Sequence, residues 1–136
     1  MIVSDQQLCE DLFELLGQVK LQMLFLAEAQ GLTSTQLLAL YVIDQHHGEL
    51  VMHEAAKVLH CDASNVTGIM DRLVNQQLIE RKEGAHDRRT KVLGLTDKGR
   101  QTIQKLKDGL PERMRCELIS DDERTVLHDV IRKLCS

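Results

Sequence analysis

The segment that decides the fold is DRRTKVLGLTDKGR, residues 87–100. Two adjacent arginines are followed by a short apolar run, and a helix start comes directly after that run. Thr96 is placed to cap this helix, and Asp97 lies in its first turn, where the helix dipole favours negative charge. Just upstream, residues 78–82 read LIERK and are a second strand candidate. The pattern predicts two short strands joined by a basic loop, with a helix following at once.

The composition of the 136 residues indicates one mainly helical domain. One proline and three aromatic residues occur, whereas aliphatic residues abound, which suits packed helices better than a sheet sandwich. No apolar run reaches the roughly 18 residues that a membrane span needs. The early acidic residues argue against a secretory signal. The cysteines form no C-x-x-C pair, so we expect a cytoplasmic protein with reduced thiols and no membrane contact.

The net charge of −4 conceals an uneven distribution of charged residues. Residues 1–71 contain 2 basic and 10 acidic side chains, residues 72–107 contain 10 and 4, and residues 108–136 contain 5 and 7. A positive block within an acidic chain is expected of a surface that faces phosphates. Charge alone is equally consistent with a merely solvated stretch.

Apolar spacing and capping signals predict six helices, of which the first is the longest. It runs from about Ser4 to Gln30, and Gly31 ends it. Apolar residues cover much of its girth, so a domain of this size cannot bury it alone and a partner subunit is the expected cover.

The next two helices flank a short strand candidate. The second helix opens with the capping-box pattern TSTQ at residues 33–36 and is apolar on nearly all sides, so we expect it to be buried. His46, His47 and Gly48 end it. Residues 49–51 can form one rung of a sheet, and a short third helix runs from Met52 to His60.

The fourth helix separates packing from function. It begins after Asp62, a good N-cap residue, and runs to about Gln76. Its apolar residues recur at helical spacing and face the core: Val66, Ile69, Met70, Leu73 and Val74. The outer face carries Ser64, Asn65, Thr67, Gly68, Asp71, Arg72 and Asn75. Short hydroxyl and amide groups can read base edges in a major groove, or they can simply make local bonds near the cap.

The last two helices are read as dimerisation elements. The fifth runs from Thr96 toward Leu106, and Gly109 with Pro111 should break or kink it. A capping box at residues 120–123 opens the sixth. One apolar face of the sixth helix would pack on the first helix of a partner or, alternatively, within the same chain: Val126, Leu127, Val130, Ile131 and Leu134.

The order of a short helix, a turn, an exposed polar helix and a basic hairpin is that of a winged helix-turn-helix. The runs SNVTGIMDRL at residues 64–73, QLIER at 77–81, DRR at 87–89 and LTDKG at 95–99 resemble the MarR family of bacterial transcription regulators. The resemblance covers nearly the whole chain. It implies a mainly α fold with a small β-hairpin wing (α+β) and N- and C-terminal dimerisation helices.

The resemblance also implies a domain plan and a partner. Residues 1–136 would be one MarR-type domain, with a winged helix-turn-helix core at about 33–100 and dimerisation helices at about 4–30 and 101–135. The family forms homodimers that bind double-stranded DNA at a pseudo-palindromic operator. Repression is its commoner outcome, so we expect a repressor that a small-molecule ligand releases from its operator.

Positions that match the family's motifs supply the expected DNA contacts. Asp87 would orient Arg89, which enters the minor groove, where a narrow groove concentrates negative potential. Arg88 and Lys91 would meet phosphates or the groove edge, and Arg72 the DNA backbone. Ser64, Asn65, Thr67 and Gly68 would lie toward the major groove. Arg81, at the base of the wing, fits a structural ion pair as well as a contact.

The signal that the regulator senses has several candidates. Family members bind small, often aromatic ligands between the dimer helices and the DNA-binding lobe, and four residues are candidates for lining such a pocket: Met23, Phe25, Tyr41 and Met52. Cys9 resembles the reactive cysteine of the hydroperoxide-sensing branch, although Tyr41 is the only tyrosine that could activate it. A small buried apolar role for Cys9 is the alternative.

Other function classes find little in the sequence. His46, His47, His53, His60 and Cys61 are close in sequence but lack the spacing of a zinc site, so we expect neither metal nor cofactor. The chain has no glycine-rich phosphate loop or nucleophile elbow, and we expect no enzyme. A winged helix that binds only protein is the remaining rival.

Overall fold

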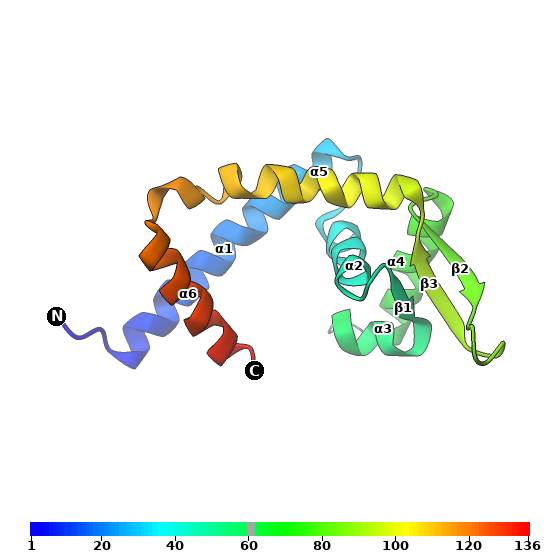
Figure 1. The fold of residues 1–136 in the computed structure, drawn as a ribbon, viewed down its shortest axis with the longest axis horizontal. Helices are drawn as coiled ribbons and strands as arrows, with labels where there is room; N and C mark the ends of the chain where they lie inside the picture. The colour runs from blue at the N-terminus through cyan, green and yellow to red at the C-terminus, as the bar shows by residue number, and fades with distance from the viewer. Residues whose placement is uncertain (60–61) are drawn as a thin grey trace.

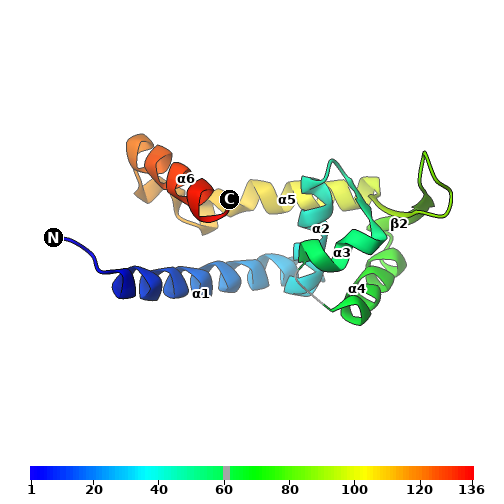
Figure 2. The same ribbon diagram turned by 90° about the horizontal axis from the view of Figure 1, so that it is seen from below.

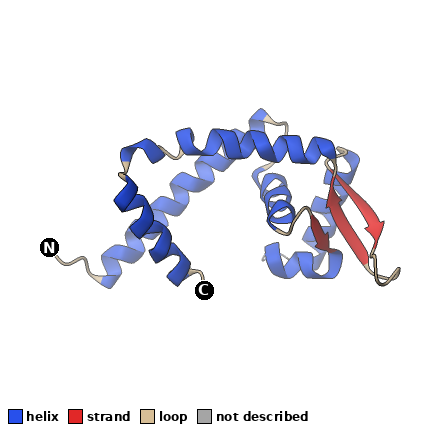
Figure 3. Cartoon of the chain, in the orientation of Figure 1, coloured by secondary structure: helices blue, strands red, loops and turns tan. Residues whose placement is uncertain are grey.

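A computed structural model describes residues 1–59 and 62–136, which form six α-helices and a three-stranded sheet (Figure 1). The elements are α1 (Asp5–Ala29), α2 (Ser34–Gln45), β1 (Glu49–Val51), α3 (Met52–Leu59), α4 (Ala63–Asn75), β2 (Ile79–Glu83), β3 (Lys91–Leu95), α5 (Asp97–Arg113), the short 3-10 helix η1 (Cys116–Leu118) and α6 (Asp121–Leu134). Figure 3 shows the strands at one end of an otherwise helical chain. The predicted mainly α fold with a small hairpin is confirmed.

The elements α2 to α4, the sheet and the first half of α5 form a lobe at one end of the molecule (Figures 1 and 2). The N-terminal part of α1 and all of α6 extend away from this lobe, and α5 connects the two parts. Fully buried aliphatic side chains from several elements fill the lobe: Leu37, Leu40, Ile43, Met70, Leu73, Leu93 and Ile103. No described helix is long and apolar enough to cross a membrane.

The sheet is antiparallel, with strand order β1-β3-β2. Leu50 of β1 lies opposite Leu93 of β3, and Lys82 of β2 lies opposite Val92. The one-rung strand expected at residues 49–51 is therefore present, and it closes the sheet against the lobe. Strand β2 starts one residue later than the expected 78–82.

The predicted helix caps are present at four helices. Thr33 Oγ1 accepts from Gln36 N, and Gln36 Oε1 accepts from Thr33 N, both at 3.1 Å. Ser120 and Glu123 make the same reciprocal pair at the start of α6. Hydrogen bonds from the Ser120 backbone N–H and hydroxyl lower the pKa of the Glu123 carboxyl. Ser4 caps α1 and Thr96 caps α5. Asp62 holds the N-cap position of α4, but its side chain makes no capping hydrogen bond.

Two expectations about helices are wrong. Helix α2 is not buried all round, since Leu38 and Tyr41 are 38% and 36% exposed. Its neighbours α1, α4 and α5 leave this strip uncovered. Helix α5 does not break at Gly109 or Pro111 but continues to Arg113. Gly109 lies against α1, where an added Cβ would be 3.3 Å from Leu26, and this packing supports the helix. The expected end of α3, His60, lies outside the described residues.

Helix α4, the sheet and α5 meet at contacts between residues 76–78 and 96–99, which we call the Thr96 junction. Gln77 has φ 61°, which turns the chain out of α4. The Thr96 hydroxyl donates to the Gln77 carbonyl at 2.6 Å and accepts from Gly99 N at 3.1 Å. Thr96 N also donates to the Leu78 carbonyl at 3.1 Å. One side chain thus joins the end of α4 to the start of α5.

Gly99 permits the close approach at this junction. A Cβ built on Gly99 would lie 2.1 Å from the Leu78 carbonyl oxygen, well inside van der Waals contact. We expect Gly99→Ala to lower the free energy of unfolding by about 1–3 kcal/mol, since backbone atoms must shift. Urea unfolding at a fixed protein concentration measures it.

The matched control is Gly68→Ala in α4, where an added Cβ meets nothing within 4 Å. Alanine there should stabilise the protein by up to about 1 kcal/mol through helix propensity. Equal effects of the two substitutions would show that the Gly99 contact is not tight.

Candidate nucleic-acid interface

Helix α4 presents a polar face to solvent and an apolar face to the core. Val66, Met70 and Leu73 are at most 2% exposed, and Ile69 is 8% exposed. All the residues predicted for the outer face are exposed: Ser64, Asn65, Thr67, Gly68, Asp71, Arg72 and Asn75. The assignment of the two faces is confirmed. The helix therefore offers hydroxyl, amide and guanidinium groups to a partner.

The loop between β2 and β3, residues 84–90, projects beyond the rest of the lobe (Figures 1 and 2). Gly84 N donates to the Thr90 carbonyl at 2.9 Å, and Thr90 N donates to the Asp87 carbonyl at 3.1 Å. Asp87 Oδ1 accepts from the backbone N of Arg89 at 2.9 Å. Asp87 therefore orients Arg89 through the backbone of the loop and leaves its guanidinium free.

Two ion pairs tie the hairpin to the lobe. Arg81 of β2 pairs with Asp71 of α4, and Lys82 pairs with Glu49 of β1. Of the two roles considered for Arg81, the structure shows the ion pair. The roles of Asp71 and Glu49 were missed, because their partners lie 10 and 33 residues away and no local pattern connects them.

The basic residues of α4 and the wing fall into two groups. Arg81 and Lys82 are paired, whereas four cations form no ion pair or side-chain hydrogen bond with any described residue: Arg72, Arg88, Arg89 and Lys91. All four are exposed. An exposed, uncompensated group of cations favours a polyanionic partner. The exposed polar face of α4 and the wing thus make a candidate nucleic-acid interface.

The four residues proposed for a ligand pocket do not lie together. Met23 and Tyr41 line a hollow of about 170 Å³ between α1, α2 and α5, with Leu37 and Leu106 among its other walls. Phe25 lies outside this hollow, and the Arg113 guanidinium sits 5.7 Å from its ring centroid. Met52 packs against the lobe core instead. The prediction of one shared site is wrong for Phe25 and Met52.

The cysteines and histidines give no second site. Cys9 and Cys135 are exposed free thiols, and Cys116 is half-buried. Within the described part of the chain, no hydrogen bond reaches the Cys9 sulfur, and its predicted burial as an apolar residue is wrong for the single chain. No three metal-ligating side chains gather within residues 1–59 and 62–136. His60 and Cys61 lie outside the described residues.

Known proteins resemble this chain in sequence and fold. A sequence profile of the MarR family matches residues 30–90. The transcriptional repressor MprA of Escherichia coli is 31% identical over 115 residues, which cover 80% of this chain and 64% of MprA. The transcriptional repressor MdtR of Bacillus subtilis is 38% identical over 98 residues, covering 72% of this chain and 61% of MdtR.

The alignments thus span less than two thirds of either relative. Among solved structures, the YusO protein of Bacillus subtilis has a TM-score of 0.67 and 30% identity, with 98% of both chains covered. The profile and the relatives agree with the winged helix-turn-helix geometry of the lobe. This chain belongs to the MarR family.

Proposed function

We propose that this chain is a sequence-specific DNA-binding transcription regulator that acts as a repressor. The observation that carries the proposal is the set of four unpaired, exposed cations on α4 and the wing. The named roles of MprA and MdtR as transcriptional repressors support it. The proposed partner is double-stranded DNA with a pseudo-palindromic operator.

The proposed docking places α4 in the major groove and the wing over the minor groove. Ser64, Asn65, Thr67 and Gly68 lie near the N-terminus of α4, the end that usually contacts base edges in this motif. Arg89 reaches the minor groove, which attracts a guanidinium. Arg88, Lys91 and Arg72 neutralise phosphates, so binding weakens as salt rises.

The operator's two-fold symmetry requires two copies of the chain. On α6, five apolar side chains are between 38% and 62% exposed: Val126, Leu127, Val130, Ile131 and Leu134. On α1, Leu8, Leu12, Leu15 and Leu16 are between 42% and 48% exposed. The chain itself covers neither face, so a homodimer in which these helices of two copies interlock is proposed. Residues 4–30 and 101–135 serve this assembly, and residues 33–100 read DNA within one domain.

The proposed effector site is the hollow that Met23 and Tyr41 line. It lies between α1, which serves the dimer, and α2 and α5 of the lobe. Its walls are almost entirely apolar side chains, so a small apolar molecule is the ligand that fits. Occupancy there would change how the lobe sits on the dimer helices and would release the operator.

The wing arginine gives the sharpest test of DNA binding. Arg89→Ala should weaken binding to a duplex from upstream of the chain's own coding sequence by about 1–3 kcal/mol, the range for a specific arginine contact. Fluorescence anisotropy at one fixed salt concentration measures this.

The control for Arg89→Ala is Arg100→Ala, which removes the same charge from a residue that pairs with Asp97 on α5. Its affinity should stay close to wild type. If both variants lose affinity equally, or neither does, Arg89 makes no specific contact. Absence of salt-sensitive binding by the wild type would favour a winged helix that binds only protein.

The dimer proposal is tested at the apolar face of α6. Val130→Asp should place a charge in the interface and reduce the mass by light scattering from twice 15.5 kDa to 15.5 kDa. Asp129→Asn, at a neighbouring exposed position, should remain dimeric. A Val130→Asp protein that is still dimeric, with unchanged helicity, would show that α6 does not form the interface.

A further inference from the structure

One further cation in the basic region is unpaired, and it lies away from α4 and the wing. Lys107 pairs with Asp44 at 2.6 Å, and Arg100 pairs with Asp97. Lys98 donates to the Gln76 carbonyl at 2.9 Å. Lys105 of α5 has no hydrogen bond or ion pair with any residue that the structure describes. The proposed DNA contacts do not explain this charge.

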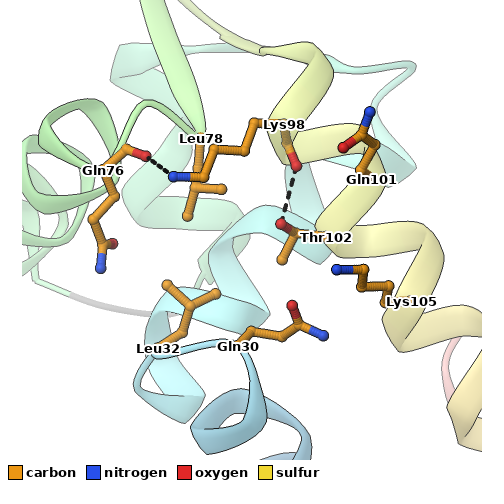
Figure 4. A pocket seen from close by; sticks show the side chains of 8 residues that line it. All are labelled: Gln30, Leu32, Gln76, Leu78, Lys98, Gln101, Thr102 and Lys105. Atoms are coloured by element: carbon orange, nitrogen blue, oxygen red, sulfur yellow. Dashed lines mark hydrogen bonds between the residues drawn. The ribbon is translucent and has the colours of Figure 1, made fainter.

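Lys105 lines a hollow of about 350 Å³ on the lobe. Its walls come from the connection between α1 and α2, the end of α4 and the first turns of α5: Gln30, Leu32, Gln76, Leu78, Lys98, Gln101, Thr102 and Lys105. Figure 4 shows Lys98 crossing from α5 to the Gln76 carbonyl, with Lys105 and Gln30 on the far side of the space. The hollow shares no wall with the one that Met23 and Tyr41 line.

The polar groups of this hollow are positive or unsatisfied. Two ammonium groups line it, and none of its lining residues is acidic. Gln76 Oε1 is buried and has no hydrogen-bond partner among the described residues. A buried acceptor without a partner is unfavourable and calls for a donor. The Thr102 hydroxyl is already engaged, since it donates to the Lys98 carbonyl at 2.9 Å.

The remaining walls are apolar. Leu32 and Leu78 are 6% and 4% exposed, so both hold fixed positions in the lobe. An occupant therefore meets hydrocarbon at Leu32 and Leu78, positive charge at Lys98 and Lys105, and an open acceptor at Gln76. A bare inorganic anion satisfies only the second of these, whereas an organic acid with a hydroxyl group satisfies all three.

We propose that this hollow binds a small organic hydroxycarboxylate. The carboxylate lies between the Lys98 and Lys105 ammonium groups, the hydroxyl donates to Gln76 Oε1, and the hydrocarbon part contacts Leu32 and Leu78. Because Gln76 is the C-cap of α4, such a ligand touches both α4 and α5. The site stands on the lobe's own geometry and does not depend on DNA binding.

Calorimetric titration of the purified full-length chain with phenyllactate, in the absence of DNA, tests the proposal. Lys105→Gln should weaken phenyllactate binding about tenfold, on the scale of a charge-assisted hydrogen bond, without changing the melting temperature. Lys105→Arg keeps the charge and should keep most of the affinity. The neutral amide of phenyllactate and the analogue without the hydroxyl should each bind more weakly than phenyllactate.

The control variant is Tyr41→Phe, which alters the other hollow and should bind phenyllactate as the wild type does. Loss of binding in Tyr41→Phe but not in Lys105→Gln would place the ligand in that hollow and overturn the proposal. Equal binding of the acid and its amide, or no binding of phenyllactate at millimolar concentration, would also overturn it. Phosphate that binds as tightly as phenyllactate would reduce the site to a general anion site and contradict the hydroxycarboxylate.

Discussion

The Thr96 junction is the constraint on which the rest of the lobe depends. A single hydroxyl donates to the Gln77 carbonyl and accepts from Gly99 N, while the Thr96 backbone N–H donates to the Leu78 carbonyl. These bonds fix the end of α4, the start of β2 and the start of α5 relative to one another. Gly99 is required because α5 passes against the Leu78 carbonyl too closely for a Cβ. The proposed DNA-reading helix and the helix that leads to the dimer face are thereby one mechanical unit.

Ion pairing divides the basic residues by role. Arg81 and Lys82 are consumed in pairs that attach the hairpin to α4 and to β1. Such exposed pairs contribute at most about 1 kcal/mol each, so their effect is to position the wing rather than to stabilise the fold. Arg72, Arg88, Arg89 and Lys91 remain hydrated and uncompensated. Transfer of their counterion atmosphere to solvent on binding DNA would supply a salt-dependent driving force.

Local signals predicted the fold well because each rests on neighbours in sequence. The capping boxes at Thr33 and Ser120, the two faces of α4 and the strand–loop–strand–helix order around Thr96 all appear as expected. The wing and its arginines came from the order of motifs and the family resemblance together. The fold and the approximate interface were therefore within reach of the sequence.

What the sequence did not predict depends on distant contacts. The continuation of α5 past Pro111 depends on packing against α1, and the exposed strip of α2 on where its neighbours stop. The Asp71–Arg81 pair and the hollow at Lys105 need residues far apart in the chain to be placed side by side. Hydrophobic periodicity assigns a residue to a face but does not identify the group opposite it.

Selection of bound sequences from a random pool of DNA duplexes by the wild-type protein tests the central claim most directly. A dimer that reads DNA through α4 and the wing should enrich two inverted half-sites whose centres lie about one helical turn, roughly 10 base pairs, apart. Enrichment of no sequence, or of a single half-site without symmetry, would contradict a dimeric, sequence-specific reader of duplex DNA.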